Sequence, residues 1–295
     1  MGVLAFFDVF MGDEHAHARE QAAYDATASL LAKNAAIYGL PDSPSLLSEE
    51  QQDILKELDM RFTPPAPLLA GRLVFGLDDS QGLSKTTANF LALCTGEKGV
   101  CKNAPNKKLH YLGCPIHRIV KGFVAQGGDI TRGDGSGGES IYGGKFNDDK
   151  AGLKKKMRRG SLAMANSGKN TNSSQFFVVL TDDESKLAKM NGKYVVFGEL
   201  LEGWDVLDRL DEVGSADGKP SVPVWIGGCG KLCLSPSTVE HIVRITSLQM
   251  FKNPDLRHAA SHFLALPASS AGMPASVRDA LTAFSDDRYT IPRGS

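Results

Sequence analysis

Glycine recurs so often between residues 96 and 234 that this part of the chain must be built from tight turns rather than long helices. No other feature of the sequence limits the fold as strongly. Between the glycines lie short runs rich in β-branched and aromatic residues, which are typical of strands. The clearest runs are residues 116–120, 123–126, 161–164, 175–180, 194–200 and 222–226.

Two further strands and two helices are predicted around these runs. Residues 3–10 and 68–78 are rich in β-branched and aromatic residues and read as strands. Ser84 can cap a helix that runs to Leu93, and a second helix fits residues 203–213. Many strands with only two short helices favour a closed antiparallel barrel, because closure leaves no exposed edge strand.

Residues 14–67 differ in character from the rest and are predicted to be helical. The alanine-rich stretch 15–38 places Ala23, Ala26, Leu30 and Ile37 on one face of a helix. Ser48 and Gln51 form the pattern of a capping box, which opens a second helix running to Met60. The segment carries 4 positive and 9 negative charges and ends in a proline-rich linker.

The remaining residues, 234–295, form a C-terminal extension in which we expect one strand and one helix. No run reaches the length of a membrane span, and the N-terminus has no positive start of a signal peptide. The net charge of -1 argues against a nucleic-acid partner. The five cysteines are too few and too clustered for a disulfide scaffold and have no paired CxxC spacing, which predicts reduced thiols, no structural zinc and a cytoplasmic location.

A cluster of chemistry-bearing residues begins at Ile116. Strand alternation puts Arg118 and Val120 on one face and His117 on the other. Phe123 and Gln126 cannot both obey strict alternation, so a bulge or kink is expected there. The cluster holds a cation, an aromatic ring and an amide, but no pair of carboxylates.

A second cluster covers residues 161–166 and 170–177, where small residues and amides alternate with aromatic rings. Such a surface can pair with a peptide backbone and present an apolar pocket. The glycine-rich run 133–138 between the clusters lacks the Lys-Ser/Thr and the following helix of a phosphate loop.

Several long motifs then stand in one order: FFD, TANFLALCTGEKG, HRIVKGFVAQGGDITRGDGSGGESIYGGKF, SLAMANSGKNTNSSQFFV, GKYVVFG and CGKL. Together they resemble the cyclophilin family of peptidyl-prolyl cis–trans isomerases. The resemblance covers residues 1–13 and 68–233 and implies an eight-stranded barrel capped by two helices. Residues 14–67 are then an insertion between the first two strands, and the loop 99–113 looks like that of divergent-loop members.

The resemblance implies rotation of X-Pro bonds without a metal or cofactor, on peptides and folding proteins. Arg118 would be the catalytic donor to the imide nitrogen. The residues that would bind the substrate are Phe123, Val124, Gln126, Gly135, Ser136, Ala165, Asn166, Ser167, Gln175, Phe177, Met190 and Tyr194. Proline-containing peptides and proteins would be the partners.

The sequence departs from the family pattern at three places. Val124 replaces a methionine, the usual tryptophan falls at Lys189, and Tyr194 stands where a histidine is usual. These changes predict weakened binding of cyclosporin-type inhibitors more than loss of catalysis. They also leave open a non-catalytic peptide-binding scaffold, or an assembly module that docks a partner through 14–67 or the extension.

Two other features carry alternatives. Residues 154–159 hold five cations in six positions, which fits a solvated loop, a nuclear address or a site for an acidic partner. Cys94 and Cys229 match a redox-linked pair of divergent-loop cyclophilins, but they can equally be buried thiols.

Overall fold

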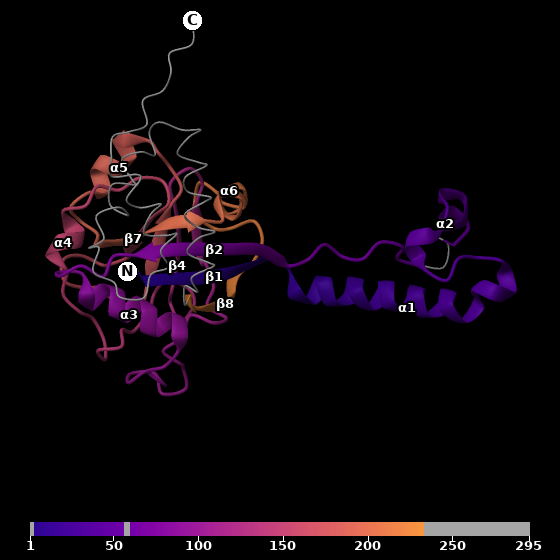
Figure 1. Ribbon diagram of the computed structural model, residues 1–295, viewed down its shortest axis with the longest axis horizontal. Helices are drawn as coiled ribbons and strands as arrows, with labels where there is room; N and C mark the ends of the chain where they lie inside the picture. Colours follow the sequence, from indigo (N-terminus) through magenta and orange to yellow (C-terminus); the bar gives the residue numbers. More distant parts are fainter. Residues whose placement is uncertain (1–2, 56–59, 233–295) are drawn as a thin grey trace, which may run out of the picture. The chain divides into compact units, whose positions relative to one another are not determined.

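The computed structural model describes residues 3–55 and 60–232. The fold is mainly β: eight antiparallel strands form one sheet in the order β3-β4-β6-β5-β7-β2-β1-β8, curled into a half-barrel (Figure 1). The strands are β1 (Val3–Met11), β2 (Leu69–Leu77), β3 (Arg118–Val120), β4 (Val124–Gly127), β5 (Ser161–Met164), β6 (Phe176–Val179), β7 (Val196–Glu202) and β8 (Val224–Leu232).

Closure of the barrel, which the sequence predicted, is not confirmed. β3 and β8 are the two ends of the sheet, and no ladder joins them among the described residues. The segment before β3 does reach β8: Ile116 N donates to Val224 O at 2.9 Å, and Ile226 N donates to Cys114 O at 3.0 Å. The sheet therefore curls far enough for its ends to be bridged by a connecting segment.

Within the described residues there are six α-helices and one short 3₁₀ helix, η1 (Pro44–Leu46). The α-helices are α1 (Glu14–Tyr38), α2 (Glu49–Leu55), α3 (Ser84–Thr95), α4 (Lys150–Leu153), α5 (Glu184–Met190) and α6 (Trp204–Glu212). The sequence predicted α3 and α6 but missed α4 and α5, because so few turns carry too little apolar periodicity. None of the helices described here is long and apolar enough to cross a membrane.

The start of α3 is satisfied differently from the prediction. Ser84 does not cap the helix; the N-cap position is Leu83, which makes no side-chain hydrogen bond there. The carboxylate of Asp149 instead accepts from Thr86 N at 2.9 Å and from Thr86 Oγ1 at 2.7 Å. A residue far away in sequence thus supplies the acceptor that helix N-termini require.

The main core is rich in aromatic rings. Its largest fully buried side chains include Phe7, Phe75, Phe90, Tyr111, Phe176 and Phe197. Tyr111 comes from the long loop between α3 and β3, and its hydroxyl donates to Ser174 O at 2.7 Å. This hydrogen bond fastens the loop to the segment that enters β6, next to the residues expected to bind substrate.

The segment between β1 and β2 folds as a small helical unit with its own apolar cluster. α1 is capped by Asp13 and ends at Gly39, whose φ of 64° lies in the left-handed region that favours glycine. The predicted capping box is confirmed, since Ser48 N donates to Gln51 Oε1 at 2.9 Å and Gln51 N donates to Ser48 Oγ at 3.3 Å.

The predicted inward face of α1 is wrong. Leu30 and Ile37 are 44% and 73% exposed, whereas Thr27, Leu31 and Ala35 are buried. The packed face is one residue further along the helix, which is a rotation of about 100°. Leu31 packs with partners that periodicity alone does not reveal, Leu47 and Phe62.

The register places β1 in the same sheet as the rest, with Val3 opposite Leu77 and Asp8 opposite Arg72. The predicted C-terminal extension, 234–295, and Cys233 lie outside the described residues.

Candidate active site

One row of side chains crosses four neighbouring strands on one face of the sheet. Arg118 of β3 is the cross-strand partner of Gln126 in β4, and Gln126 is the partner of Phe177 in β6. Phe177 in turn pairs with Ala163 in β5. Because directly opposed residues point to the same side, the cation, the amide and the aromatic ring share one surface.

The row belongs in part to a second apolar cluster, separate from the main core, which includes Ala163 and Phe177. This cluster contains six residues that the resemblance assigned to substrate binding, namely Phe123, Val124, Ala165, Phe177, Met190 and Tyr194. The rings of Phe177 and Tyr194 meet edge to face, with centroids 5.2 Å apart and planes at 87°. Residues from four separate segments thus form one apolar wall, suited to an aliphatic ring such as that of proline.

Phe123 joins the wall without the expected bulge. It lies in the turn before β4, where its N donates to Val120 O at 3.0 Å. The β3–β4 register runs without a shift, and Val124 and Gln126 lie on one face. The conflict in alternation disappears because Phe123 lies in the turn and is not a strand residue, so no bulge interrupts the pairing of β3 with β4.

The amides at the site form a chain that ends on the glycine-rich loop. Gln126 Nε2 donates to Gln175 Oε1 at 2.9 Å. Gln175 Nε2 donates to Gly135 O at 2.9 Å and to Gly137 O at 2.7 Å. The loop 133–138 is therefore a fixed wall of the site.

Gly135 itself requires glycine. Its φ is 91°, and a Cβ there would lie 2.6 Å from Nε2 of His117. Ser136 beside it is exposed, and its hydroxyl donates to Asp134 Oδ1 at 2.6 Å.

Asp129 holds this loop, and the sequence analysis missed its role. The residue is only 1% exposed. Its Oδ2 accepts from Gly135 N at 2.9 Å and from Gly137 N at 3.0 Å, and its Oδ1 accepts from Arg132 N at 3.0 Å. Burial favours a raised pKa, but these hydrogen bonds outweigh it and hold the pKa of Asp129 well below its usual value. The position of Asp129 shortly before the glycine-rich run 133–138 is the sequence signal that could have indicated this role.

Arg118 is exposed and, within the described part of the chain, its guanidinium has no ion-pair or hydrogen-bond partner. Its methylenes rest against Gly218. Nδ1 of the neighbouring His117 is buried without a hydrogen-bond partner among the described residues. Burial lowers the pKa of His117, while Asp129 and Asp134 oppose this.

The other residues assigned to peptide binding follow β5. Ala165 N donates to Gln175 O at 3.0 Å, which brings Ala165 and Asn166 beside the amide chain. Ser167 is exposed one residue further on. On α5, Met190 turns into the apolar cluster while Lys189 is exposed, so the position of the family's tryptophan faces solvent here.

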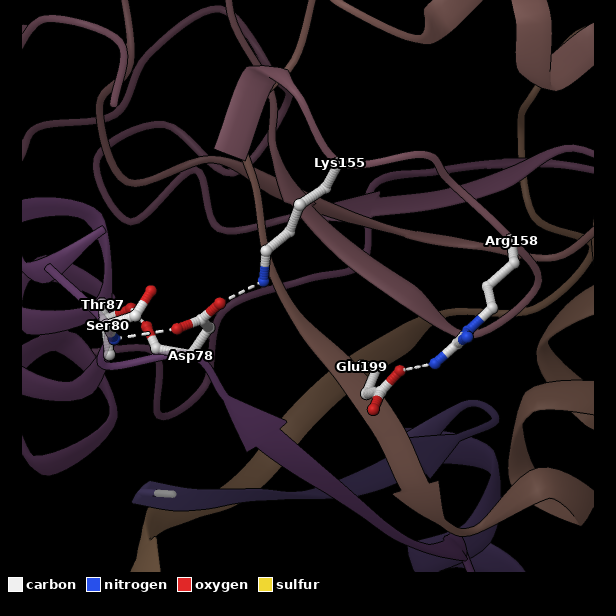
Figure 2. Close-up of polar contacts among 6 residues, drawn as sticks. All are labelled: Asp78, Ser80, Thr87, Lys155, Arg158 and Glu199. Atoms are coloured by element: carbon white, nitrogen blue, oxygen red, sulfur yellow. Dashed lines mark hydrogen bonds and ion pairs between the residues drawn. The ribbon is translucent and has the colours of Figure 1, made fainter. Parts of the chain in front are cut away.

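The basic segment 154–159 is engaged in the fold rather than free. Lys155 pairs with Asp78 at the end of β2, and Arg158 pairs with Glu199 of β7, as Figure 2 shows. Arg159 pairs with Asp208 of α6. Lys154 and Lys156 are the cations of this segment that have no such partner among the described residues.

The two cysteines of the redox hypothesis are free thiols in this structure. Burial raises the pKa of Cys94 strongly and that of Cys229 to about 12. The ring of His110 lies between them: its Nε2 is 3.2 Å from Cys94 O and 3.5 Å from Cys229 Sγ. Both raised pKa values keep the thiols protonated at neutral pH, and protonated thiols react slowly.

A comparison with protein families gives one match. The family described as "Cyclophilin type peptidyl-prolyl cis-trans isomerase/CLD" matches residues 62–231, more than half of the chain. The match contains both chemistry-bearing clusters and β2 to β7. β1 lies outside it in sequence but inside the same sheet.

Proposed function

Because this chain belongs to the cyclophilin-type peptidyl-prolyl cis–trans isomerase family, we propose that it catalyses rotation about X-Pro bonds in peptides and folding proteins. The family supplies the reaction class and proline-containing peptides as substrates. Activity, and the roles of individual residues, are what we propose for this chain.

The reaction needs little chemistry from the protein. Rotation about a peptide bond breaks amide resonance, with a barrier of about 18–20 kcal/mol. No bond is cleaved, so the reaction calls for neither a nucleophile nor a general base. A site needs only to hold the proline ring while the preceding carbonyl turns, and to stabilise the twisted state, in which the imide nitrogen becomes pyramidal and accepts a hydrogen bond.

The observation that carries the proposal is the row across β3, β4, β6 and β5. It sets the guanidinium of Arg118, which no described residue pairs, beside the apolar wall of Phe123, Phe177 and Met190. The wall would hold the proline ring, and Arg118 would donate to the imide nitrogen. Such a donor stabilises the transition state selectively, because the planar ground-state nitrogen is a poor acceptor.

The amides would hold the peptide on either side of the proline. Gln126 and Gln175 are already linked to each other and to the loop at Gly135. A preformed amide chain loses little entropy when the substrate binds.

The second candidate is a peptide-binding scaffold that uses the same wall without catalysis. Exposed Lys189 and partly buried Tyr194 favour it, because both depart from the family pattern. The free guanidinium of Arg118 favours catalysis instead.

The deciding experiment measures kcat/KM for a short X-Pro peptide with wild type, Arg118→Ala and Arg118→Lys. We expect a drop of about 10²–10³ for Arg118→Ala, the size typical of losing one transition-state donor. Arg118→Lys should recover part of it. Thermal stability should hardly change, since the side chain is exposed and unpaired. Wild type that binds the peptide without accelerating isomerisation would establish the scaffold instead.

A further inference from the structure

A second hollow adjoins the candidate active site on the side of β5 and β7. It is a pocket of about 520 Å³ whose walls are the segments 166–169 and 192–194, with Asp148 and Leu153 completing it. Asn166, Ser167 and Tyr194 line this pocket and also belong to the residues assigned to substrate. A peptide held at the apolar wall would therefore have this pocket within reach of its next residues.

Asn166 ties the two walls together. Its Nδ2 donates to Lys193 O at 3.0 Å, and its Oδ1 accepts from Gly168 N at 3.2 Å. Both ends of the amide are used internally, so Asn166 shapes the pocket and leaves recognition to its neighbours.

The pocket offers positive charge that no ion pair with a described residue neutralises. Lys169 and Lys193 are exposed, and neither ammonium has an ion-pair or hydrogen-bond partner among residues 3–55 and 60–232. The hydroxyls of Ser167 and Tyr194 are likewise unpartnered in that part of the chain. Two cations and two hydroxyl donors thus surround the hollow.

The one carboxylate in the pocket is already occupied. Asp148 Oδ1 accepts from Asn172 Nδ2 at 2.8 Å, and its Oδ2 accepts from Asn170 N at 2.8 Å. Asp148 therefore orders the loop 166–172 and does not pair with either lysine. The pocket keeps a surplus of donors and of positive charge.

From this arrangement we propose that the pocket is a specificity subsite for a carboxylate side chain, an Asp or Glu of the substrate on one side of the isomerised proline. The inference rests on the proposed function, because it uses the same bound peptide. Lys169 and Lys193 supply the charge, Ser167 and Tyr194 supply hydrogen bonds, and Leu153 contacts the methylene groups. The chain then selects acidic segments that contain proline.

The test uses peptides with blocked ends, in which Glu or Gln is placed in turn at each of three positions before and after the proline. For each position the kcat/KM of the Glu peptide is divided by that of the Gln peptide. At one or two positions on a single side of the proline this ratio should reach about 5 at low salt, as expected for two exposed charge pairs. It should fall towards 1 as salt is added.

Variants assign the effect to the pocket. Lys193→Gln and Lys169→Gln should each lower the ratio, and the double variant should bring it to about 1. Lys193→Glu should reverse the preference in favour of a Lys peptide, which a purely structural role of Lys193 would not produce. Lys107→Gln is the matched control, because Lys107 is an exposed lysine outside the pocket.

The two proposals fail separately. If wild type isomerises the Gln peptides but shows a ratio near 1 at every position, the subsite is wrong and the isomerase stands. A ratio that Lys107→Gln lowers as much as Lys193→Gln also overturns the subsite, because it shows a general effect of charge. If no peptide is turned over, the affinities of the same Glu and Gln peptides, measured by NMR titration, test the subsite alone.

Discussion

At the scale of the single residue, Asp129 shows how a buried charge can organise a site that it does not enter. Its carboxylate accepts from the backbone of Arg132, Gly135 and Gly137 and from the Thr131 hydroxyl. The loop so held presents Gly135 O and Gly137 O to Gln175. Asp129 is thus a positioning residue for the amide chain.

Replacing Asp129 with Asn should destabilise the fold by roughly 2–3 kcal/mol, because the amide nitrogen then faces backbone N–H donors in a buried place. The kcat/KM should fall with it, mainly through a higher KM, since the peptide-binding amides lose their anchor. Urea unfolding and steady-state kinetics measure the two effects. Asp134→Asn is the matched control, because Asp134 lies in the same loop but is exposed. An unchanged KM in Asp129→Asn would contradict this role.

The pH dependence of stability follows from the same carboxylate. The pKa of Asp129 is lowered in the folded state from an ordinary value of 3.8, so the unfolded chain binds its proton first as pH falls. Its stabilisation is therefore complete above the unfolded value and is lost as pH falls through 3.8 towards the folded pKa. Wild type should lose more free energy of unfolding than Asp129→Asn between about pH 5 and pH 2. Parallel curves for the two proteins would exclude Asp129 as a source of acid sensitivity.

At the scale of the element, the segment 154–159 acts as a strap. Its ion pairs reach β2, β7 and α6, and Arg159 also lies over the ring of Trp204, 5.6 Å from its centroid. Between these cations Met157 points inward and is 5% exposed. It packs in the same apolar cluster as Val124 and Met190, and its N donates to Asn191 Oδ1 at 2.9 Å. The ion pairs fix the segment 154–159 to the sheet and to α6, and Met157 packs against the apolar wall of the site.

Met157→Ala should cost about 2–4 kcal/mol of stability, the range for truncating a buried methionine. It should also raise KM for a proline peptide, because the truncation leaves a cavity next to Met190 and Val124 in the apolar wall. Lys156→Ala is the control next to it in the chain: the side chain is exposed, so its effect should stay within about 0.5 kcal/mol. Denaturation and kinetics of the two variants decide the matter. Equal effects of both substitutions would show that Met157 is not a support of the wall.

At the scale of the whole molecule, the helical segment between β1 and β2 has its own cluster of buried residues, Leu31, Leu47 and Phe62. The strands that flank it remain paired up to its base, where Met11 N donates to Leu68 O at 2.8 Å. The two ends are therefore already at the spacing of a hairpin. This agrees with the interpretation of the segment as an insertion.

Replacing residues 13–67 with an Asn-Gly turn should leave a cooperative fold and the same kcat/KM. Stability should not fall, because closing a much shorter loop saves up to about 3 kcal/mol of chain entropy. A partner that docks on this acidic segment should no longer bind. Thermal unfolding, kinetics and a pull-down with both forms provide the three readouts. Loss of the barrel on deletion would show that the segment supports the fold.

Local chemistry in the sequence determined a large part of this protein. Strand runs, the capping box at Ser48 and the family motifs follow from neighbours in the chain, so they can be read without a structure. Alternation also placed Arg118 and Val120 on one face. Such features depend on interactions over a few residues, which sequence periodicity reports directly.

The tertiary structure decided what depends on distant partners. It chose Thr27, Leu31 and Ala35 as the buried face of α1, because Leu47 and Phe62 pack there. It placed the carboxylate of Asp149 at the start of α3, where it accepts from Thr86 N. It also paired the cations of segment 154–159 with carboxylates from three separate parts of the fold. It also brought Lys169 and Lys193 into one pocket beside Tyr194. Each of these outcomes requires residues that are close in space but far apart in the chain, and no local pattern specifies which ones will meet.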